Sequence, residues 1–152
     1  MKLKMLLRSF LVIFLCFTLA SCDNDDYPYA DIPSVVLNHF WAEFPQAKEV
    51  EFREIDGKYE IEFEQEDKER KALVSLQGNL LREKIEITLK ELPSAVTQSI
   101  ERLFPEKDVE DFELVRAGEE IYYQVQIDRF FRDKKIVLDK FGELDSSKKF
   151  WN

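Results

Sequence analysis

The segment "DIPSVVLNHFWAEFP" (residues 31–45) recurs in altered form as "ELPSAVTQSIERLFP" (residues 91–105), at a constant offset of 60 positions. In the first copy, Val36, Phe40 and Phe44 recur at helical spacing, and a proline stands near either end of the segment. This pattern predicts a short amphipathic helix in each copy. The positions that are identical in both copies are Pro33, Ser34, Val36, Phe44 and Pro45. Such a repetition indicates that a larger folding unit is duplicated.

After the first helical segment, the apolar residues change from helical spacing to strict alternation, which is typical of half-buried strands. Tyr59, Ile61 and Phe63, for example, alternate with glutamates, directly after the hairpin signal Asp56-Gly57. The alternating segments of the first copy are residues 49–53, 58–64, 71–77 and 81–89. We therefore expect four antiparallel strands to follow the first helix.

The second copy repeats this order, now at an offset of 64 positions. Tyr123 takes the place of Tyr59, and Gly142 takes the place of the turn glycine Gly78. A unit of about 60 residues buries only about 60% of its unfolded surface and is marginal alone. The predicted fold is therefore one α+β body made by tandem duplication of a helix plus a four-stranded antiparallel sheet. We expect the two sheets to be joined or abutting, with both helices on the apolar face.

This pattern resembles the PepSY-like family of bacterial envelope lipoproteins, which is related in fold to the β-lactamase-inhibitor protein. The resemblance covers about residues 31–151 and divides them into repeats at 31–90 and 91–152. It implies a non-enzymatic fold that serves as a binding or inhibitory module. The elements that carry it are the two "[IL]P…FP" helices, the "Y-x-[IV]-x-[FI]" strands at Tyr59 and Tyr123, and the turns ending in Gly78 and Gly142.

One departure from the family pattern concerns the turn before the last strand of each copy. The family commonly has an aspartate three residues before the turn glycine. The second copy keeps it as Asp139, whereas the first copy has Ser75. A role of this acid beyond the geometry of the turn is therefore not implied for both copies.

The first residues of the chain form a targeting signal rather than a folded element. Three basic residues precede an apolar run that is far shorter than the ~20 residues of a membrane-spanning helix. The run ends in "LASC", which resembles the bacterial lipoprotein signal. We therefore predict a signal peptide over residues 1–21 and lipidation of Cys22. The alternative is an ordinary secretory peptide cleaved near Ser21.

The acidic stretch at residues 22–30 is interpreted as a tether between the lipid and the folded part. A signal for export to the cell surface and a calcium site are its alternatives. The expected location is the cell envelope, lipid-anchored at the outer membrane, facing the periplasm or the cell surface. The lipid anchor is the only membrane contact that we expect.

The charge of the processed chain restricts the class of partner. Residues 1–21 hold three of the 22 basic residues and none of the 31 acidic ones, so their removal leaves a net charge of −12. Such a surface repels nucleic acid and favours basic partners or cations. Cys22 would be the only cysteine left, so neither a disulfide nor a cysteine metal site is expected.

No constellation in the sequence predicts catalysis, a metal or a cofactor. His39 is the only histidine, and neither a second ligand four residues away nor a nucleophile elbow accompanies it. Glu60, Glu62 and Glu64 alternate along one strand. They form either a solvated face, partly paired with lysines on neighbouring strands, or a docking face for a basic partner.

Aromatic residues without an equivalent in the other copy are the remaining candidates. Trp41 stands where the second copy has Glu101, and Phe130 and Phe131 lie in or beside a turn that is polar in the first copy. Phe150-Trp151 stands directly before the last residue of the sequence, Asn152. These residues either seal the interface between the copies or form an exposed recognition patch.

The sequence therefore predicts a non-enzymatic, lipid-anchored envelope protein that binds another protein or a peptide. The identity of this partner is unknown, and the acidic charge favours a basic one. In one version of the hypothesis, the binding inhibits the partner. A structural or accessory subunit of an envelope complex is the alternative. A hydrolase would require two carboxylates that converge in a cleft.

The lipidation of Cys22 is tested by substitution. Cys22→Ser removes the acceptor thiol, so the variant should be soluble or unprocessed and should incorporate no labelled palmitate. Labelling that persists in the variant would refute the assignment.

Overall fold

The computed structural model describes residues 29–105, 109–128 and 133–152 of the chain. The predicted site residues Cys22, Phe130 and Phe131 lie outside the described residues. Contacts within the chain separate residues 1–31 from residues 32–152, and the fold described here is that of the second unit.

The two predicted helices are confirmed as α2 (Ser34–Glu43) and α3 (Ser94–Leu103). Each begins directly after a proline, whose carbonyl oxygen accepts the first helical hydrogen bond, at 2.9 Å in α2 and 3.0 Å in α3. Proline suits this place because it has no N–H group and its φ is already helical. The residue after each helix is a phenylalanine, and a second proline then prevents the helix from continuing.

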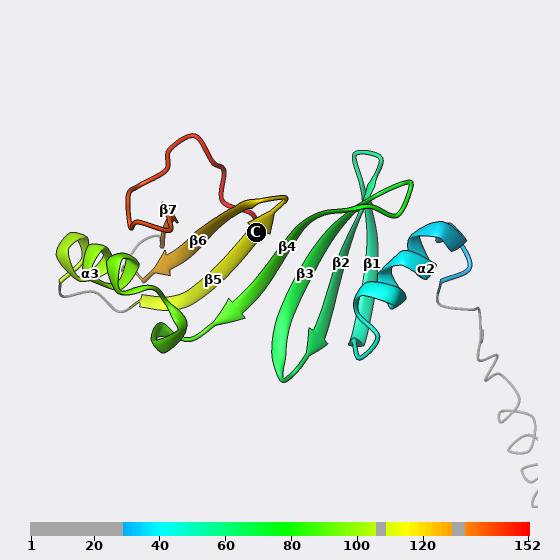
Figure 1. Ribbon diagram of the computed structural model, residues 1–152, viewed down its shortest axis with the longest axis horizontal. Coiled ribbons are helices and arrows are strands. Elements are labelled where there is room, and N and C mark those ends of the chain that lie inside the picture. Colours follow the sequence, from blue (N-terminus) through cyan, green and yellow to red (C-terminus); the bar gives the residue numbers. More distant parts are fainter. Residues whose placement is uncertain (1–28, 106–108, 129–132) are drawn as a thin grey trace, which may run out of the picture. The chain divides into compact units, whose positions relative to one another are not determined.

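The strands described by the structure form one continuous antiparallel sheet of seven strands, arranged in sequence order (Figure 1). A short 3₁₀ helix, η1 (Leu89–Glu91), and α3 lie between the fourth and fifth strands in the chain. The strands are β1 (Lys48–Ile55), β2 (Lys58–Gln65), β3 (Lys68–Ser75), β4 (Leu80–Ile87), β5 (Val109–Ala117), β6 (Glu120–Ile127) and β7 (Lys134–Asp139).

The two copies are joined through the backbone of β4 and β5. These strands pair over five positions, from Glu83 opposite Arg116 to Ile87 opposite Phe112. Of the two arrangements expected from the sequence, joined or abutting sheets, the structure has the first.

Both helices cover the same face of the sheet, here called the helix face. Val36, Phe40 and Phe44 of α2 pack on β2 and β3, and the equivalent residues of α3 pack on β4 to β7. The strand register aligns the apolar sides of neighbouring strands. Ile61 lies opposite Ala72, and Ala72 lies opposite Glu83. Ile85, two residues after Glu83, therefore points to the same side of the sheet as Ile61 and Ala72. The other side of the sheet, here called the far face, carries no helix in the described part of the chain.

The predicted fourth strand of the second copy is not present. In its place, the described residues show a single bridge between Leu138 and Leu144. The chain then turns at Asp145, whose carboxylate accepts a hydrogen bond from the backbone of Ser147 at 3.0 Å. In the first copy the corresponding strand buries Ile85, but the second copy has Lys149 at that position, and a lysine cannot enter the apolar core uncompensated.

The turn glycines Gly78 and Gly142 lie where a turn packs tightly against the helix of the same copy. Both have positive φ, +85° and +80°. A Cβ atom at Gly78 would lie 2.7 Å from His39 Nδ1, and one at Gly142 would lie 2.7 Å from Ser99 Oγ. Since real Cβ contacts are never so short, only glycine fits where the hairpin touches the helix.

The side chain at the start of these turns has the same role in both copies. Asp139 Oδ1 accepts hydrogen bonds from the backbone N–H groups of Phe141 and Glu143, both at 2.9 Å. In the first copy, Ser75 Oγ accepts from Gln77 and Asn79 at 3.3 and 3.1 Å. The aspartate of the family pattern thus accepts hydrogen bonds from the backbone of the turn, and in the first copy a serine does the same.

The close approach of hairpin and helix is tested with two glycines of similar φ. Gly142→Ala should destabilise the fold by about 1–3 kcal/mol more than Gly118→Ala, because its Cβ must displace the backbone of α3. Gly118 also has positive φ (+62°), but nothing lies within 4 Å of a Cβ placed there. Urea denaturation of both variants measures the difference, and equal losses would contradict the packing argument.

Candidate binding groove

The far face is partly covered by the last described residues of the chain, 148–152, here called the strap. The side chain of Trp151 in this strap is only 7% exposed. It packs with Val115, Tyr122 and Val137, which form a small apolar cluster on the far face. The strap thus provides the cover that the helices provide on the other side.

Trp151 is fixed by contacts to both copies. Its indole Nε1 donates to Glu60 Oε2 at 2.7 Å, on β2 of the first copy. Its backbone N–H donates to Gln124 Oε1 at 2.9 Å, and its carbonyl oxygen accepts from Gln124 Nε2 at 3.0 Å, on β6 of the second copy. The guanidinium of Arg82 lies 4.1 Å from the ring centroid. The aromatic residues without an equivalent in the other copy were expected either to seal the interface between the copies or to form an exposed patch. Trp151 contacts both copies and is buried, so it does the former.

Of the two interpretations of the glutamate row, the solvated face does not hold for Glu60, because this residue lies beneath Trp151 and is only 6% exposed. Burial alone would raise the pKa of this carboxyl. Hydrogen bonds from Trp151 and Arg53, together with the positive charge of Lys71, outweigh the burial and hold the pKa below its ordinary value. Glu60 is therefore an ionised anchor of the strap.

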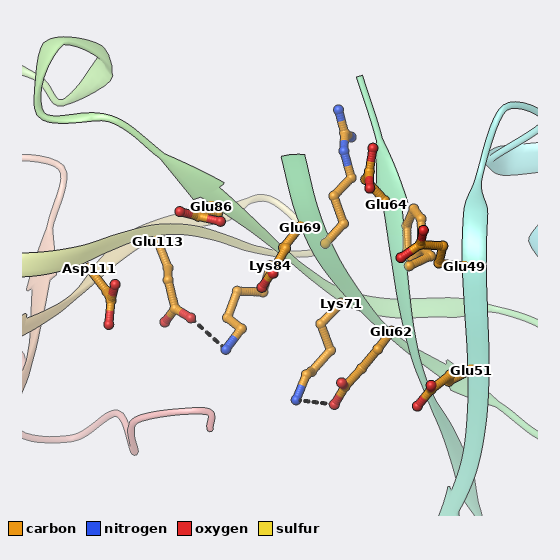
Figure 2. A pocket seen from close by; sticks show the side chains of 12 residues that line it. Glu49, Glu51, Glu62, Glu64, Glu69, Lys71, Lys84, Glu86, Asp111 and Glu113 are labelled. Atoms are coloured by element: carbon orange, nitrogen blue, oxygen red, sulfur yellow. Dashed lines mark ion pairs between the residues drawn. The ribbon is translucent and has the colours of Figure 1, made fainter. Parts of the chain in front are cut away.

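Beside the strap, the far face is hollowed by a groove of about 700 Å³ (Figure 2). Its lining comes mainly from β1 to β5 and is dominated by eight carboxylates, with three cations. The residues that line it are Glu49, Glu51, Glu62, Phe63, Glu64, Glu69, Arg70, Lys71, Lys84, Glu86, Asp111 and Glu113. Of the predicted row, Glu62 and Glu64 thus belong to the groove, whereas Glu60 does not line it.

Carboxylates face one another directly across neighbouring strands of the groove. The register places Glu51 opposite Glu62, Glu64 opposite Glu69, and Glu86 opposite Glu113. Like charges in directly opposed positions destabilise a sheet. The electrostatic repulsion between these carboxylates therefore lowers the stability of the sheet and does not help to hold the fold together.

The two lysines of the groove relieve only part of this repulsion. Lys71 pairs with Glu62 at 2.7 Å, and Lys84 pairs with Glu113 at 2.6 Å (Figure 2). In Figure 2, both lysine side chains extend away from Glu64, Glu69 and Glu86. No ion pair in the described part of the chain neutralises these three carboxylates.

The other predicted site residues lie elsewhere. Trp41 is 37% exposed on α2, with its ring edge-on to Phe40 at 5.1 Å, so it is not buried between the copies. His39 donates from Nδ1 to the carbonyl oxygen of Gly78 at 3.0 Å and so joins α2 to the β3–β4 turn. Sequence reasoning missed Glu69 and Glu86. Glu86 stands between Ile85 and Ile87, but Glu69 stands between Lys68 and Arg70, so it gives no alternation signal. Only the strand register brings Glu69 next to Glu64 and Glu86 next to Glu113.

The described residues contain no group of three or more His, Cys, Asp and Glu side chains that could hold a metal ion. Because the groove carboxylates are distributed over several strands, the surface is suited to several separate positive charges rather than to one ion. Within the same residues, no helix has the length and apolar character needed to cross a membrane.

Comparison with known proteins agrees with the duplicated architecture. A family model described as "Putative beta-lactamase-inhibitor-like, PepSY-like" matches the chain twice in succession, over residues 18–82 and 81–146. This confirms the resemblance found in the sequence. No curated protein matches the chain.

Solved structures share the fold at low sequence identity. A protein from Bacteroides eggerthii, titled a putative periplasmic protein, has a TM-score of 0.70 at 17% identity, covering 74% of this chain and 84% of its own. A DUF2874 family protein from Bacteroides uniformis has a TM-score of 0.68 at 17% identity, with 74% and 85% covered. A BLIP-like protein from Bacteroides fragilis has a TM-score of 0.66 at 15% identity, with 84% and 98% covered. The TM-scores establish a common fold, and at such low identities the similarity shows nothing about the partner.

The ionised anchor predicts a pH-dependent stability. A carboxyl whose pKa is lowered by folding stabilises the protein above its unfolded pKa, and this contribution is lost as the pH falls through the folded value. Glu60→Gln should therefore be less stable than the wild type at pH 7, and the difference should shrink as the pH falls below about 4.5, the ordinary value. Denaturation at a series of pH values measures the difference.

Glu54→Gln, at an exposed position, is the control for this measurement and should change stability little at any pH. A difference between wild type and Glu60→Gln that stays constant from pH 7 to pH 3 would refute the role of Glu60.

Proposed function

The chain belongs to the PepSY-like family, and we propose that it is a non-enzymatic binding module of the cell envelope whose groove docks a basic protein or peptide segment. The observation that carries this proposal is the set of opposed carboxylates on the far face. Three cross-strand acid pairs lie in one groove, and Glu64, Glu69 and Glu86 have no cation partner within the described residues.

Charge complementarity identifies the class of partner. A bound segment that carries lysine or arginine would relieve a repulsion already present in the free protein, so part of the binding free energy comes from the groove itself. A neutral or acidic segment would leave the repulsion in place and would lose the hydration of the carboxylates. The groove therefore favours a positively charged segment over a neutral or an acidic one.

The arrangement of the strands sets the size of this segment. The lining carboxylates extend from β1 to β5, and neighbouring strands are about 4.8 Å apart, so they span roughly 19 Å. An extended peptide advances about 3.3 Å per residue and would cross this distance in about six residues. We therefore propose a partner segment with two or three basic residues at alternating positions.

Trp41 is proposed as a separate contact. It lies on α2, on the helix side of the sheet, whereas the groove is on the far face. An exposed tryptophan commonly anchors a protein interface. A partner that touches both surfaces would have to pass around the free edge of the sheet at β1. Phe130 and Phe131 remain sequence-based proposals for partner contacts.

The cellular location rests on the N-terminal signal and on the neighbours. The Bacteroides eggerthii structure is titled a putative periplasmic protein, and the lipoprotein-type signal before Cys22 agrees with that compartment. We propose that the folded unit is held at the envelope by a lipid on Cys22. The family description as β-lactamase-inhibitor-like supports an inhibitory version of the binding role, with an accessory subunit as the alternative.

The proposal is tested with a fluorescent probe peptide of alternating lysine and threonine, eight residues long. Fluorescence anisotropy at low ionic strength should detect binding that weakens steeply as salt is added, because exposed charges are screened within about 10 Å at 0.1 M. The variant Glu64→Gln/Glu69→Gln/Glu86→Gln should bind at least about tenfold more weakly, since each exposed charge contact contributes up to about 1 kcal/mol.

The control variant is Glu54→Gln/Glu119→Gln/Glu143→Gln, which removes the same charge at exposed positions outside the groove. If both triple variants lose the same affinity, the interaction depends only on net charge and the groove is not the site. An aspartate–threonine peptide of the same length should not bind to any variant.

A further inference from the structure

We propose that the strap sets which carboxylates of the acidic groove stay unpaired, by holding the side chains of Lys71 and Lys84 beside Glu62 and Glu113 and away from Glu69 and Glu86. This inference rests on the proposed function, because it concerns the affinity of the same groove. The strap would thus be a positioning element for binding as well as a cover for the far face.

The two lysines share two kinds of partner, and Lys71 Nζ lies in addition 3.5 Å from Glu60 Oε1. Lys71 Nζ donates to the backbone oxygen of Asn152 at 2.9 Å, and Lys84 Nζ donates to the backbone oxygen of Trp151 at 2.9 Å. Each also pairs with one groove carboxylate, Glu62 or Glu113. Both lysine side chains are almost buried, with exposed fractions of 12% and 11%. The strap therefore takes up a hydrogen-bonding position that would otherwise be open to another acceptor.

The competing acceptors are close by along the same strands. Glu69 lies two residues before Lys71 on β3, and Glu86 lies two residues after Lys84 on β4, so each pair points to the far face. Side chains at such positions are about 6.6 Å apart at their base, and a lysine has a flexible four-carbon stem. Without the strap oxygens, both ammonium groups can turn toward Glu69 and Glu86, which would leave Glu62 and Glu113 unpaired in their place.

The anchoring of the strap does not depend on the unpaired carboxylates. Trp151 is held by Glu60, Gln124 and Arg82, none of which lines the groove. A change at Trp151 therefore alters the lysine positions without removing any acid of the binding surface. A partner or modification that loosens the strap would lower the affinity for a basic segment in the same way.

The test combines a strap variant with removal of the lysine charges, using the same lysine–threonine probe and the full chain. Trp151→Ala should weaken probe binding by about three- to tenfold, since new ion pairs of up to about 1 kcal/mol each would occupy Glu69 and Glu86, two of the carboxylates proposed to contact the probe. In the Lys71→Met/Lys84→Met background, Trp151→Ala should change the affinity by less than about twofold, because no ammonium remains to move. Trp151→Phe loses the indole hydrogen bond to Glu60 but keeps an aromatic ring and the backbone bonds to Gln124, so the strap should stay in place and the variant should bind nearly like the wild type.

A second readout follows the lysines directly and does not need a partner. Acetylation by an activated ester, located by mass spectrometry, should be slow at Lys71 and Lys84 in the wild type and faster in Trp151→Ala. The exposed Lys140 serves as the internal reference. Circular dichroism at the assay temperature establishes that each variant is folded. If Trp151→Ala unfolds, Gln124→Leu replaces it as the variant that loosens the strap, because it removes the two hydrogen bonds from the Gln124 side chain to the backbone of Trp151.

The outcomes separate the two proposals. If the wild type binds the probe but Trp151→Ala binds equally well, or loses affinity equally in both backgrounds, the role of the strap is wrong while the groove remains the site. If the wild type does not bind the probe, the proposed function fails and this inference fails with it.

Discussion

The backbone pairing of β4 with β5 is the constraint on which the rest of this structure depends. It joins the last strand of one copy to the first strand of the next, so the two copies share one sheet rather than packing as separate bodies. A strand that pairs on both sides has no free edge to expose. Since each copy alone would bury too little surface, this ladder and the strap above it make the pair one folding unit.

A shared sheet also separates the two faces of the molecule by role. The helix face is covered in both copies by the same proline-to-phenylalanine helix, held against its hairpin by a glycine at the point of contact. The far face carries the features in which the copies differ: the strap, the buried Glu60 and the acidic groove. Stability thus comes mainly from what is repeated, and the proposed binding surface from what is not.

Sequence periodicity predicted the helices, most strands and the joined α+β body, because apolar spacing and turn glycines are local signals. It failed at the last strand of the second copy, where Lys149 replaces a core isoleucine and the chain turns to the far face. It also did not reveal that Glu60 is buried, since alternation gives the side of a strand on which a residue lies but not what covers that side. Glu69 and Glu86 could not be grouped with Glu64, because their proximity follows from cross-strand register.

Native-state hydrogen exchange tests the central claim most directly, because it gives a free energy of opening for each amide. If the two copies are one cooperative unit, protected amides of β2, β4, β5 and β6 should exchange with a common free energy, equal to that of global unfolding by urea. Exchange of β5 and β6 at a lower free energy than β2 and β3 would mean that the copies fold separately, and would contradict the account.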